Sequence, residues 1–368
     1  MEKVDLAVIG GGAVGCATAR QASFDFPNWK ILVLEKNACF GIEASGRNSG
    51  VLHSGFHHPV GSLKERLANR GSKLAKSYAM DNQVLLLNCG MLVVIPKLGS
   101  LKEVTKYVRL LKDMFINGKR QRLKFLVLTG VGVRKLEPEV EAVAGIFLPE
   151  VRVINFSHFV RTLVTDAIRK QVDFIFKTEV KDISVVGSNF VINDSIQTRA
   201  IVNCSGIYAD IIASMVGLQY HQYPVRGEYY EIVGPKRNIV SRLVNPAVPP
   251  GHSNKGIHFG PRPDGRLFLG PSFKPLRDRG DYESDKTAPE VFLDSCKAFV
   301  PNLTVADLRW AYSGIRAKLS IDHDSDFIIR ADLTNPIFIN NIGIDSPGLS
   351  ASMAIAEMNC ELLKQNIK

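Results

Sequence analysis

Apolar positions change their spacing from one segment of the chain to the next. Residues 4–9 and 30–34 are short and almost wholly apolar, which predicts buried strands, and residues 13–23 between them are predicted to form a helix. The chain therefore opens with a strand–helix–strand unit. Further helices are predicted over 62–80, 101–115, 156–169, 286–299 and 350–368, and further strands over 84–95 (with a turn at Cys89 and Gly90), 174–176 and 201–203.

The middle of the chain has a different pattern. Residues 219–275 are rich in Tyr, Val, Pro and Gly, which predicts several antiparallel strands, one of them over 256–260. Helices and strands mix at both ends, so the predicted fold class is α/β, or α+β overall. We expect a discontinuous Rossmann-like nucleotide-binding domain from residues 1–82, 145–216 and 310–368. Residues 83–144 and 217–309 would form an inserted domain of mixed β-sheet that caps the nucleotide and binds the substrate.

The composition is that of an ordinary globular protein. The chain has 368 residues, of which 45% are hydrophobic and 22% charged, and this excludes a disordered, collagen-like or coiled-coil protein. No apolar run is long enough for a membrane helix. The net charge of +10, from 46 basic and 36 acidic residues, favours a carboxylate substrate, a phosphate-bearing cofactor or an anionic surface as partner. It does not by itself imply nucleic acid, and no nucleic-acid partner is predicted.

Cysteine spacing and the start of the chain bear on the compartment. The six cysteines are scattered without a Cys-x-x-Cys pair, which indicates reduced thiols and neither a disulfide framework nor a zinc site, so no metal is predicted. A strand begins at Val4, which leaves no room for a signal or transit peptide before it. We expect a cytoplasmic protein, or a mitochondrial one if a presequence has been removed.

Residues 102–124 carry eight basic residues against Glu103 and Asp113. Two interpretations stay open for this helix. It is either a solvated face or a patch that docks the protein peripherally on an anionic membrane, where it would reach a quinone.

A glycine-rich turn follows the first strand. Residues 10–15 read GGGAVG and contain the pattern G-x-G-x-x-G. Gly10 allows the tight turn, Gly12 lets the backbone approach a pyrophosphate, and Gly15 lets helix and strand pack closely. Glu35, at the end of the second strand, suits the hydroxyl groups of a ribose and would repel a 2′-phosphate. The combination predicts dinucleotide binding, and the alternative is an ordinary glycine-rich turn.

Residues 43–50 favour FAD over NAD. The segment reads EASGRNSG and is small, polar and glycine-rich. A tricyclic ring and a ribityl chain need close approach of the backbone and several hydrogen-bonding partners, which Ser45, Arg47, Asn48 and Ser49 supply. Standing alone, the segment would be interpreted as a surface loop.

Seven segments, in one order along the chain, resemble the FAD-dependent oxidoreductases of the D-amino-acid-oxidase/glycine-oxidase superfamily. Within it, the chain is most similar to the L-2-hydroxyglutarate dehydrogenases. The segments are 10–15, 45–55 (SGRNSGVLHSG), 59–64 (PVGSLK), 203–206 (NCSG), 224–230 (PVRGEYY), 314–316 (GIR) and 346–350 (SPGLS). The second and fifth are fairly specific, and the others belong to the wider superfamily.

The chain also departs from those enzymes. It is shorter, chiefly before Trp310, and Arg47 stands where they often carry His. His57 and His58 stand where they often carry aromatic residues. The pocket is therefore expected to differ, and the resemblance leaves the exact acid open.

The resemblance implies FAD as cofactor and a set of residues that hold it. Cys204 is expected to be a small packed residue at a strand end. The helix start at 347–350 is expected to point N–H groups at the flavin, although an ordinary helix cap would have the same sequence. The expected cofactor-binding residues are Gly10, Gly12, Ala13, Val14, Gly15, Glu35, Lys36, Ser45, Arg47, Asn48, Ser49, Gly50, Val180, Cys204, Ser205, Gly206, Gly314, Arg316, Pro347, Gly348, Leu349 and Ser350.

His53 and Arg316 are the expected catalytic residues. His53 could take a hydroxyl proton from the substrate, could be a structural residue beside the cofactor, or could carry covalently attached flavin. Arg316 is the best candidate for a clamp on a carboxylate, because a guanidinium group offers two parallel hydrogen bonds.

Four further residues are expected to bind substrate. Arg226 is either a second clamp or a buried ion pair with Glu228. Tyr229 and Tyr230 alternate along a strand, so one of them faces the pocket. His258 is either structural or a pocket residue.

The predicted function is oxidation of a small L-2-hydroxy acid to the 2-oxo acid, with hydride transfer to flavin N5 and later electron transfer to a separate acceptor such as a quinone or oxygen. The 2-hydroxyglutarate assignment follows from the resemblance alone. The alternatives are an enzyme that oxidises an amino acid or N-methyl amine, an enzyme that oxidises glycerol 3-phosphate, and a non-catalytic flavoprotein.

Overall fold

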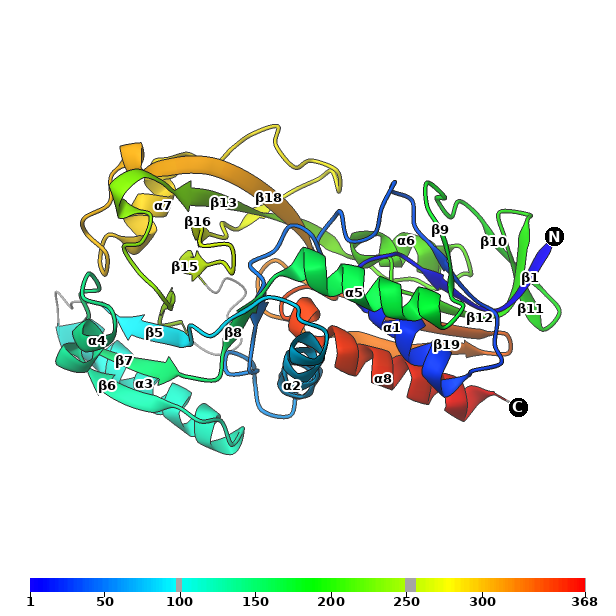
Figure 1. Cartoon of the computed structure of the whole chain (residues 1–368), viewed down its shortest axis with the longest axis horizontal. Helices are drawn as coiled ribbons and strands as arrows, with labels where there is room; N and C mark the ends of the chain where they lie inside the picture. Colours follow the sequence, from blue (N-terminus) through cyan, green and yellow to red (C-terminus); the bar gives the residue numbers. More distant parts are fainter. Residues whose placement is uncertain (97–100, 249–255, 368) are drawn as a thin grey trace.

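The computed structural model describes residues 1–96, 101–248 and 256–367, with only the backbone of residues 101–104. Its strands form two large sheets, which lie at opposite ends of an elongated molecule, and one small sheet between them (Figure 1). Among the helices of these residues, none has the length and apolarity needed to span a bilayer.

The first sheet contains the opening strand of the chain at its centre. Its order is β10-β11-β12-β1-β2-β9, with β20 paired to β12 and β19 paired to β20. The strands β9, β2, β1, β12 and β20 run parallel to one another. The strands are β1 (Glu2–Ile9), β2 (Ile31–Leu34), β9 (Asp173–Ile175), β10 (Ile183–Val186), β11 (Asn189–Ile192), β12 (Ile196–Asn203), β19 (Ile328–Thr334) and β20 (Ile337–Ile342).

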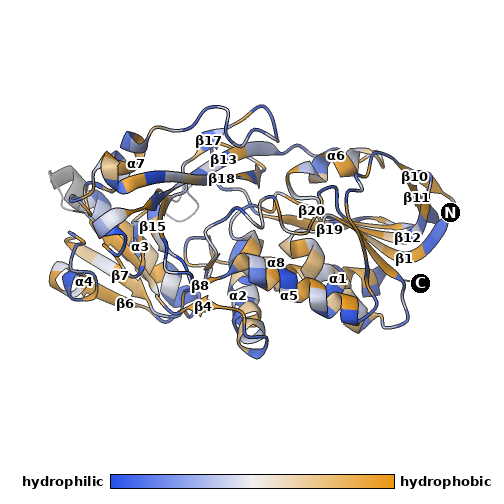
Figure 2. Cartoon of the chain, turned by 45° about the horizontal axis from the view of Figure 1, so that its top comes forward, coloured by the Kyte–Doolittle hydropathy of each residue, from blue (hydrophilic) through white to orange (hydrophobic). Residues whose placement is uncertain are grey.

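Both faces of this sheet are covered, which explains why its central strands are apolar throughout. Leu6 and Val8 of β1 pack against α1 (Ala13–Asp25), α5 (Phe156–Arg169) and α8 (Gly348–Asn366). Ala7 and Ile9 face the opposite way, toward β10, β11 and α6 (Ala209–Ser214). Figure 2 shows β1 and β12 in the hydrophobic colour over most of their length.

The second sheet has the order β17-β13-β16-β15-β14-β5-β7-β6, and β18 pairs with β13. The long antiparallel ribbon of β13 and β18 arches from this sheet toward the first one (Figure 1). The strands are β5 (Met91–Ile95), β6 (Leu126–Thr129), β7 (Ala144–Leu148), β13 (Tyr223–Ile232), β14 (Leu243–Pro246), β15 (His258–Pro261), β16 (Leu267–Gly270), β17 (Lys274–Pro275) and β18 (Leu308–Lys318). The helices α3 (Leu101–Arg120), α4 (Gly130–Leu136) and α7 (Pro289–Cys296) and the short helices η2 (Gly234–Lys236) and η3 (Val305–Asp307) accompany it.

A small sheet and two helices join the halves. The small sheet pairs β3 (Val51–Leu52) and β4 (Leu86–Leu87) with β8 (Arg152–Ile154). Helix α2 (Leu63–Asp81) packs so closely on α8 that a Cβ at Gly71 would lie 2.3 Å from the carbonyl oxygen of Ser350. A glycine is therefore required at this crossing.

The predicted α/β class, α+β overall, is confirmed, and most predicted elements are present within a few residues of their expected ends. Two expectations, one about residues 219–275 and one about residues 310–318, need correction. The strands of 219–275 are not all antiparallel, because β14 pairs in parallel with β5, and residues 249–255 lie outside the described part. Residues 310–318, expected in the nucleotide domain, lie in β18 of the second sheet. Their partner, β13, is some eighty residues earlier in the sequence, so local pattern could not reveal the pairing.

Candidate functional site

A cavity of about 640 Å³ lies where the first sheet meets the β13–β18 ribbon. Its walls come from the carboxyl ends of β1, β2 and β12, from one face of the ribbon and from the start of α8. The carboxyl ends of parallel strands are where such sheets bind their ligands. The volume is that of an ordinary ligand site.

Most of the residues predicted from the sequence line this one cavity. They are Gly10, Gly12, Ala13, Val14, Glu35, Lys36, Ser45, Arg47, Asn48, Ser49, His53, Val180, Cys204, Ser205, Gly206, Tyr229, His258, Gly314, Arg316, Pro347, Gly348, Leu349 and Ser350. Gly15, Gly50, Arg226 and Tyr230 are not among its lining residues.

The glycine turn shows why each glycine is needed. Gly10 has φ +107°, and a Cβ on it would lie 2.5 Å from the carbonyl oxygen of Cys204. A Cβ on Gly15 would lie 1.9 Å from the carbonyl oxygen of Gly10, so Gly15 allows α1 to start directly against the turn. Gly12 is less crowded and lines the cavity, with Ser45 Oγ as the nearest atom, 3.1 Å from an added Cβ. The turn therefore leaves its open side to a ligand.

Glu35 is buried at the end of β2, beside this turn. Its Oε2 accepts the N–H of Gly11 at 2.7 Å, and its Oε1 accepts the backbone N–H and the side-chain amide of Asn37, both at 2.8 Å. Oε1 already accepts two hydrogen bonds, but Oε2 accepts one and keeps a second lone-pair site, so the group can also accept a hydroxyl of a ribose.

The loop of residues 43–50 lies against the start of α1. Ser45 Oγ accepts the N–H of Ala13 at 2.8 Å, and the Asn48 side chain holds the loop through the carbonyls of Ala44 and Ser45. Gly314 of β18 is needed for the same packing, because a Cβ on it would lie 2.1 Å from the carbonyl oxygen of Arg47. The loop is thus fixed between α1 and the ribbon, with its small side chains on the cavity.

Arg316 points from β18 into the cavity. Its Nη2 donates to the carbonyl of Ser272 at 3.2 Å, and no carboxylate in the described ranges lies within ion-pair distance of it. Burial lowers its pKa, opposed by Tyr229 and Asp345, but a guanidinium stays charged in proteins. A Cβ on Gly227, which faces Gly314 across the ribbon, would lie 2.6 Å from Nη2. The glycine therefore makes room for the guanidinium group.

His53 lies beside the start of α8. Its backbone N–H donates to Ser350 Oγ at 2.8 Å, and this hydroxyl donates to the carbonyl of Val51 at 3.0 Å. Ser350 thereby ties the strand β3 to the first turn of α8. His53 and the start of α8 consequently share one wall of the cavity.

His258 faces the cavity from β15 and is buried. Burial lowers its pKa to about 4, and the charges of Arg316 and Arg262 add to the effect, while a hydrogen bond to Gly256 opposes it. The ring is therefore neutral at pH 7. Since Nδ1 lies 3.2 Å from the carbonyl of Gly256, it must carry the proton there, which leaves Nε2 as an acceptor.

Two lysines and two aspartates form a buried cluster at the cavity wall, which sequence reasoning missed. Lys318 Nζ lies 2.9 Å from Asp345 Oδ2, and Lys64 Nζ lies 2.7 Å from both Asp345 Oδ1 and Asp324 Oδ1. The alternation along β18 could have indicated Lys318, two residues after Arg316. The aspartates come from loops that carry no such pattern.

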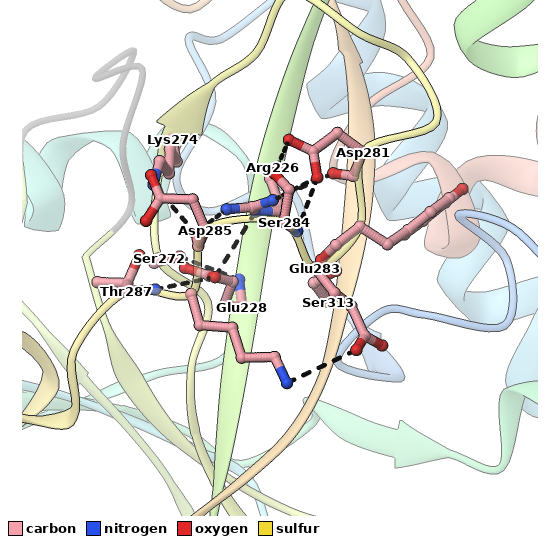
Figure 3. A network of polar contacts seen from close by, with 12 residues as sticks. Arg226, Glu228, Ser272, Lys274, Asp281, Glu283, Ser284, Asp285, Thr287 and Ser313 are labelled. Atoms are coloured by element: carbon pink, nitrogen blue, oxygen red, sulfur yellow. Dashed lines mark hydrogen bonds and ion pairs between the residues drawn. The ribbon is translucent and has the colours of Figure 1, made fainter.

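Arg226 and Tyr230 lie on the opposite face of β13 from Gly227 and Tyr229, which corrects their expected role in binding substrate. For Arg226 the structure shows the other interpretation, a buried ion pair with Glu228. The guanidinium of Arg226 is fully buried among Glu228 and Asp281, at 3.6 and 3.0 Å (Figure 3). The hydroxyl of Tyr230 donates to the carbonyl of Thr287 at 2.8 Å. Because successive side chains of a strand point to opposite faces, Arg226 and Tyr230 cannot share the cavity with Tyr229.

Gly15 and Gly50 act behind the cavity and not on its surface. Gly15 packs helix against turn, as described above. Gly50 has φ +68°, and a Cβ on it would lie 2.6 Å from the carbonyl oxygen of Ile154. Cys204 does line the cavity, and burial raises the pKa of its thiol to about 12, so it is a neutral packed residue.

Comparison with known proteins agrees with this geometry. A relative from Nematostella vectensis, named mitochondrial L-2-hydroxyglutarate dehydrogenase, is 27% identical over 97% of this chain and 90% of its own length. An L-2-hydroxyglutarate dehydrogenase from Salmonella houtenae is 26% identical over 95% of this chain and 91% of its own. A glycerol 3-phosphate dehydrogenase from Caloramator mitchellensis is 27% identical over 99% of this chain and 74% of its own.

Solved structures share the fold. An L-alpha-glycerophosphate oxidase from Mycoplasma pneumoniae with FAD bound superposes with a TM-score of 0.87 at 25% identity, over 99% of this chain and 95% of that one. Glycine oxidase from Geobacillus kaustophilus superposes with a TM-score of 0.83 at 19% identity, over 100% and 96%. The family model described as FAD dependent oxidoreductase (DAO) matches residues 5–362. The chain therefore belongs to the DAO family and is an FAD-dependent oxidoreductase, as the resemblance and the predicted cofactor implied.

Proposed function

We propose that this enzyme oxidises a small L-2-hydroxy acid, with L-2-hydroxyglutarate as the model, to the corresponding 2-oxo acid. The single observation that carries the proposal is the buried, charged Arg316 on the cavity wall, whose polar contact among the described residues is a carbonyl and not a carboxylate. A buried cation without an anionic partner is costly, and a carboxylate of the substrate would supply one. The names of the relatives support the choice of acid.

The residues of the cavity fit FAD. The open side of the glycine turn and the start of α1 would hold the pyrophosphate, and Glu35 would hold a ribose. The loop of residues 43–50 and the turn after β12 would lie along the rest of the cofactor, with the start of α8 beside the flavin ring. Bound there, FAD supplies a hydride acceptor.

The protein's own contribution is to bind, orient and deprotonate the substrate. Arg316 would hold the carboxylate by two parallel hydrogen bonds and so fix the adjacent carbon. His53 would accept the hydroxyl proton as the hydride leaves that carbon. The hydroxyl group has a single proton, so His258, whose ring is neutral near pH 7 with Nε2 as an acceptor, is the alternative acceptor of that proton if His53 does not take it.

Glycerol 3-phosphate is the second candidate substrate. A relative of similar identity and the Mycoplasma pneumoniae structure carry names that refer to it. Arg316 would bind a phosphate as well as a carboxylate. The two substrates differ in the anion beside the reacting carbon, so they can be separated directly.

The test is anaerobic reduction of the purified holoenzyme, followed as bleaching of the flavin absorption, with L-2-hydroxy acids, glycerol 3-phosphate and amino acids. We expect bleaching by an L-2-hydroxy acid, and a fall in its kcat/KM of about a hundredfold or more in Arg316→Lys, because lysine cannot make the bidentate contact. Bleaching by glycerol 3-phosphate alone, or by an amino acid alone, would replace the proposal.

We further propose that the electron acceptor is reached at an anionic membrane. The proposed docking surface consists of exposed apolar residues on α3 (Val108, Phe115 and Ile116) among exposed basic ones on α3 and in the turn after it (Lys106, Arg109, Lys112, Lys119, Arg120 and Arg122). Apolar side chains surrounded by positive charge suit the interface of an anionic bilayer. For the helix that carries this surface, the sequence left two interpretations open, a solvated face and a patch that docks on a membrane.

A further inference from the structure

Residues 276–288 form a segment that crosses between the two halves of the molecule, which we call the strap. It is the yellow loop above β13 and β18 in Figure 1. It starts at the second sheet, where the N–H of Leu276 donates to the carbonyl of Pro224 at 2.9 Å, and it leads to α7. The strap has no strand partner of its own over most of its length, so side chains must hold it in place.

On the side of the second sheet, two buried charges hold the strap. Arg226 donates from Nη1 to Asp281 at 3.0 Å and from Nη2 to the carbonyl of Asp285 (Figure 3). Glu228 accepts the N–H of Thr287 at 3.1 Å. Both side chains are fully buried, and buried charges of this kind are stable only with such partners. Arg226 and Glu228 therefore alternate with the cavity residues along β13 but point to the strap and not into the cavity.

On the side of the first sheet, Arg279 holds the strap. Its Nη1 and Nη2 donate to the two carboxylate oxygens of Asp210 at 2.5 and 2.8 Å, and Nη1 also donates to the carbonyl of Ile207 at 2.5 Å. Burial acts to raise the pKa of Asp210, but the hydrogen bonds from Arg279 and the backbone outweigh it and lower the pKa. Ile207 lies in η1 (Gly206–Tyr208), the turn that forms the cavity wall after β12. The anchor is therefore on the cofactor side of the molecule.

Between the anchors, the strap brings Tyr282 onto the cavity. Tyr282 lines it together with Arg47, whose guanidinium carbon lies 4.6 Å from the centroid of the Tyr282 ring. Ser313 Oγ donates to the carbonyl of Tyr282 at 2.6 Å. The ring and the guanidinium thus form a cation–π pair that joins the strap to the loop of residues 43–50.

We propose that Arg279, Arg226 and Glu228 are positioning residues that hold the strap, and with it the Tyr282–Arg47 pair, over the bound cofactor, and that this contact slows the release of FAD. The inference rests on the assignment of the cavity to FAD. A ligand that must displace an anchored segment before it leaves has a slower dissociation rate, and this holds whichever substrate the enzyme oxidises.

The test is the rate of FAD release from the holoenzyme, followed as the rise of flavin fluorescence after dilution, without any substrate. We expect Tyr282→Ala and Arg279→Ala to release FAD about tenfold faster, the equivalent of ~1.4 kcal/mol. Tyr282→Phe keeps the ring and should release FAD at the parent rate, and Arg279→Lys should be intermediate because it keeps the charge without the fork. Arg277→Ala, at an exposed strap position two residues from Arg279, is the matched control.

The proposal is overturned if Tyr282→Ala and Arg279→Ala release FAD no faster than Arg277→Ala. It is also overturned if the FAD-free forms of both variants have a lower melting temperature than the FAD-free parent. The strap would then be a general structural element, and the faster release would follow from a less stable fold. Should Arg279→Ala fail to fold, the comparison of Tyr282→Ala with Tyr282→Phe decides alone. A wrong assignment of the cavity shows separately, because Gly12→Ala in the glycine turn would then leave FAD affinity unchanged.

Discussion

His258 is a histidine that the fold keeps neutral. Its folded-state pKa of about 4 lies below the ordinary value of 6.5 because the ring is buried near Arg316 and Arg262. Between these two values the unfolded chain binds a proton at this site and the folded chain does not. The free energy of unfolding should therefore rise with pH across this window, by about 3 kcal/mol in total from this one group.

The prediction is tested by urea unfolding of the holoenzyme and of His258→Gln at several pH values between 4 and 7. The variant should lack this part of the pH dependence, and its difference from the parent should change with pH in that window alone. His221→Gln, at an exposed position, should keep the parent's profile. Parallel profiles for parent and His258→Gln would show that the ring is not held neutral.

Arg226 and Arg316 show what the sequence could and could not predict about single residues. Both are candidate clamps in the sequence, because a guanidinium group can hold a carboxylate by two parallel hydrogen bonds. The alternation of a strand predicted that only one of Tyr229 and Tyr230 faces the cavity, but it could not say which. That choice depends on which face of β13 meets the first sheet. Glu228, one acidic partner of Arg226, is two residues away and was a candidate in the sequence, but Asp281 comes from the strap, 55 residues later.

The glycine turn and α1 form one unit, in which two glycines have separable roles. Gly15→Ala should destabilise the protein by about 1–3 kcal/mol or more, because the added methyl overlaps the backbone of Gly10. Gly12→Ala should keep the fold, because only the movable hydroxyl of Ser45 is close, yet weaken FAD binding by narrowing the cavity.

Thermal unfolding and FAD titration of the purified variants separate the two effects. Gly260→Ala is the control, because it lies buried in β15 with its nearest atom, Leu243 Cδ2, 3.9 Å from an added Cβ. It should change neither stability nor FAD affinity by much. The separation of roles is wrong if Gly12→Ala loses stability as Gly15→Ala does, or if both bind FAD like the parent.

Elements with a strong local signal were predicted well, and those fixed by distant partners were not. Residues 156–169 form α5 as predicted, because the apolar spacing and an N-cap at Asn155 are both local. Residues 310–318 lacked such a signal, since β18 is defined by its pairing with β13. The domain assignment from sequence was therefore least accurate where the ribbon joins the two halves.

The cavity itself is a property of the whole chain, and this limits what the sequence could show of it. The motifs at 10–15, 43–50, 314–316 and 346–350 meet in one place although they span nearly all 368 residues. Motifs predicted that convergence, because each is typical of the same cofactor. The cluster of Lys318, Asp324 and Asp345 has no motif and depends on where α2, β18 and α8 come together.

The proposed docking surface makes a prediction about the molecule as a whole. At low salt the holoenzyme should sediment with vesicles that contain phosphatidylserine and not with vesicles of phosphatidylcholine alone, and salt should release it because the attraction is screened. The double reversal Lys112→Glu, Lys119→Glu should weaken binding about thirtyfold or more, since each basic residue near the surface contributes about 1 kcal/mol.

A matched reversal at the exposed residues Arg237 and Lys297, outside this surface, alters the net charge equally and should have a much smaller effect. Equal losses in the two variants would mean that net charge alone attracts the protein, and the assignment of this surface would then be wrong, because a specific face must respond to where the charge lies.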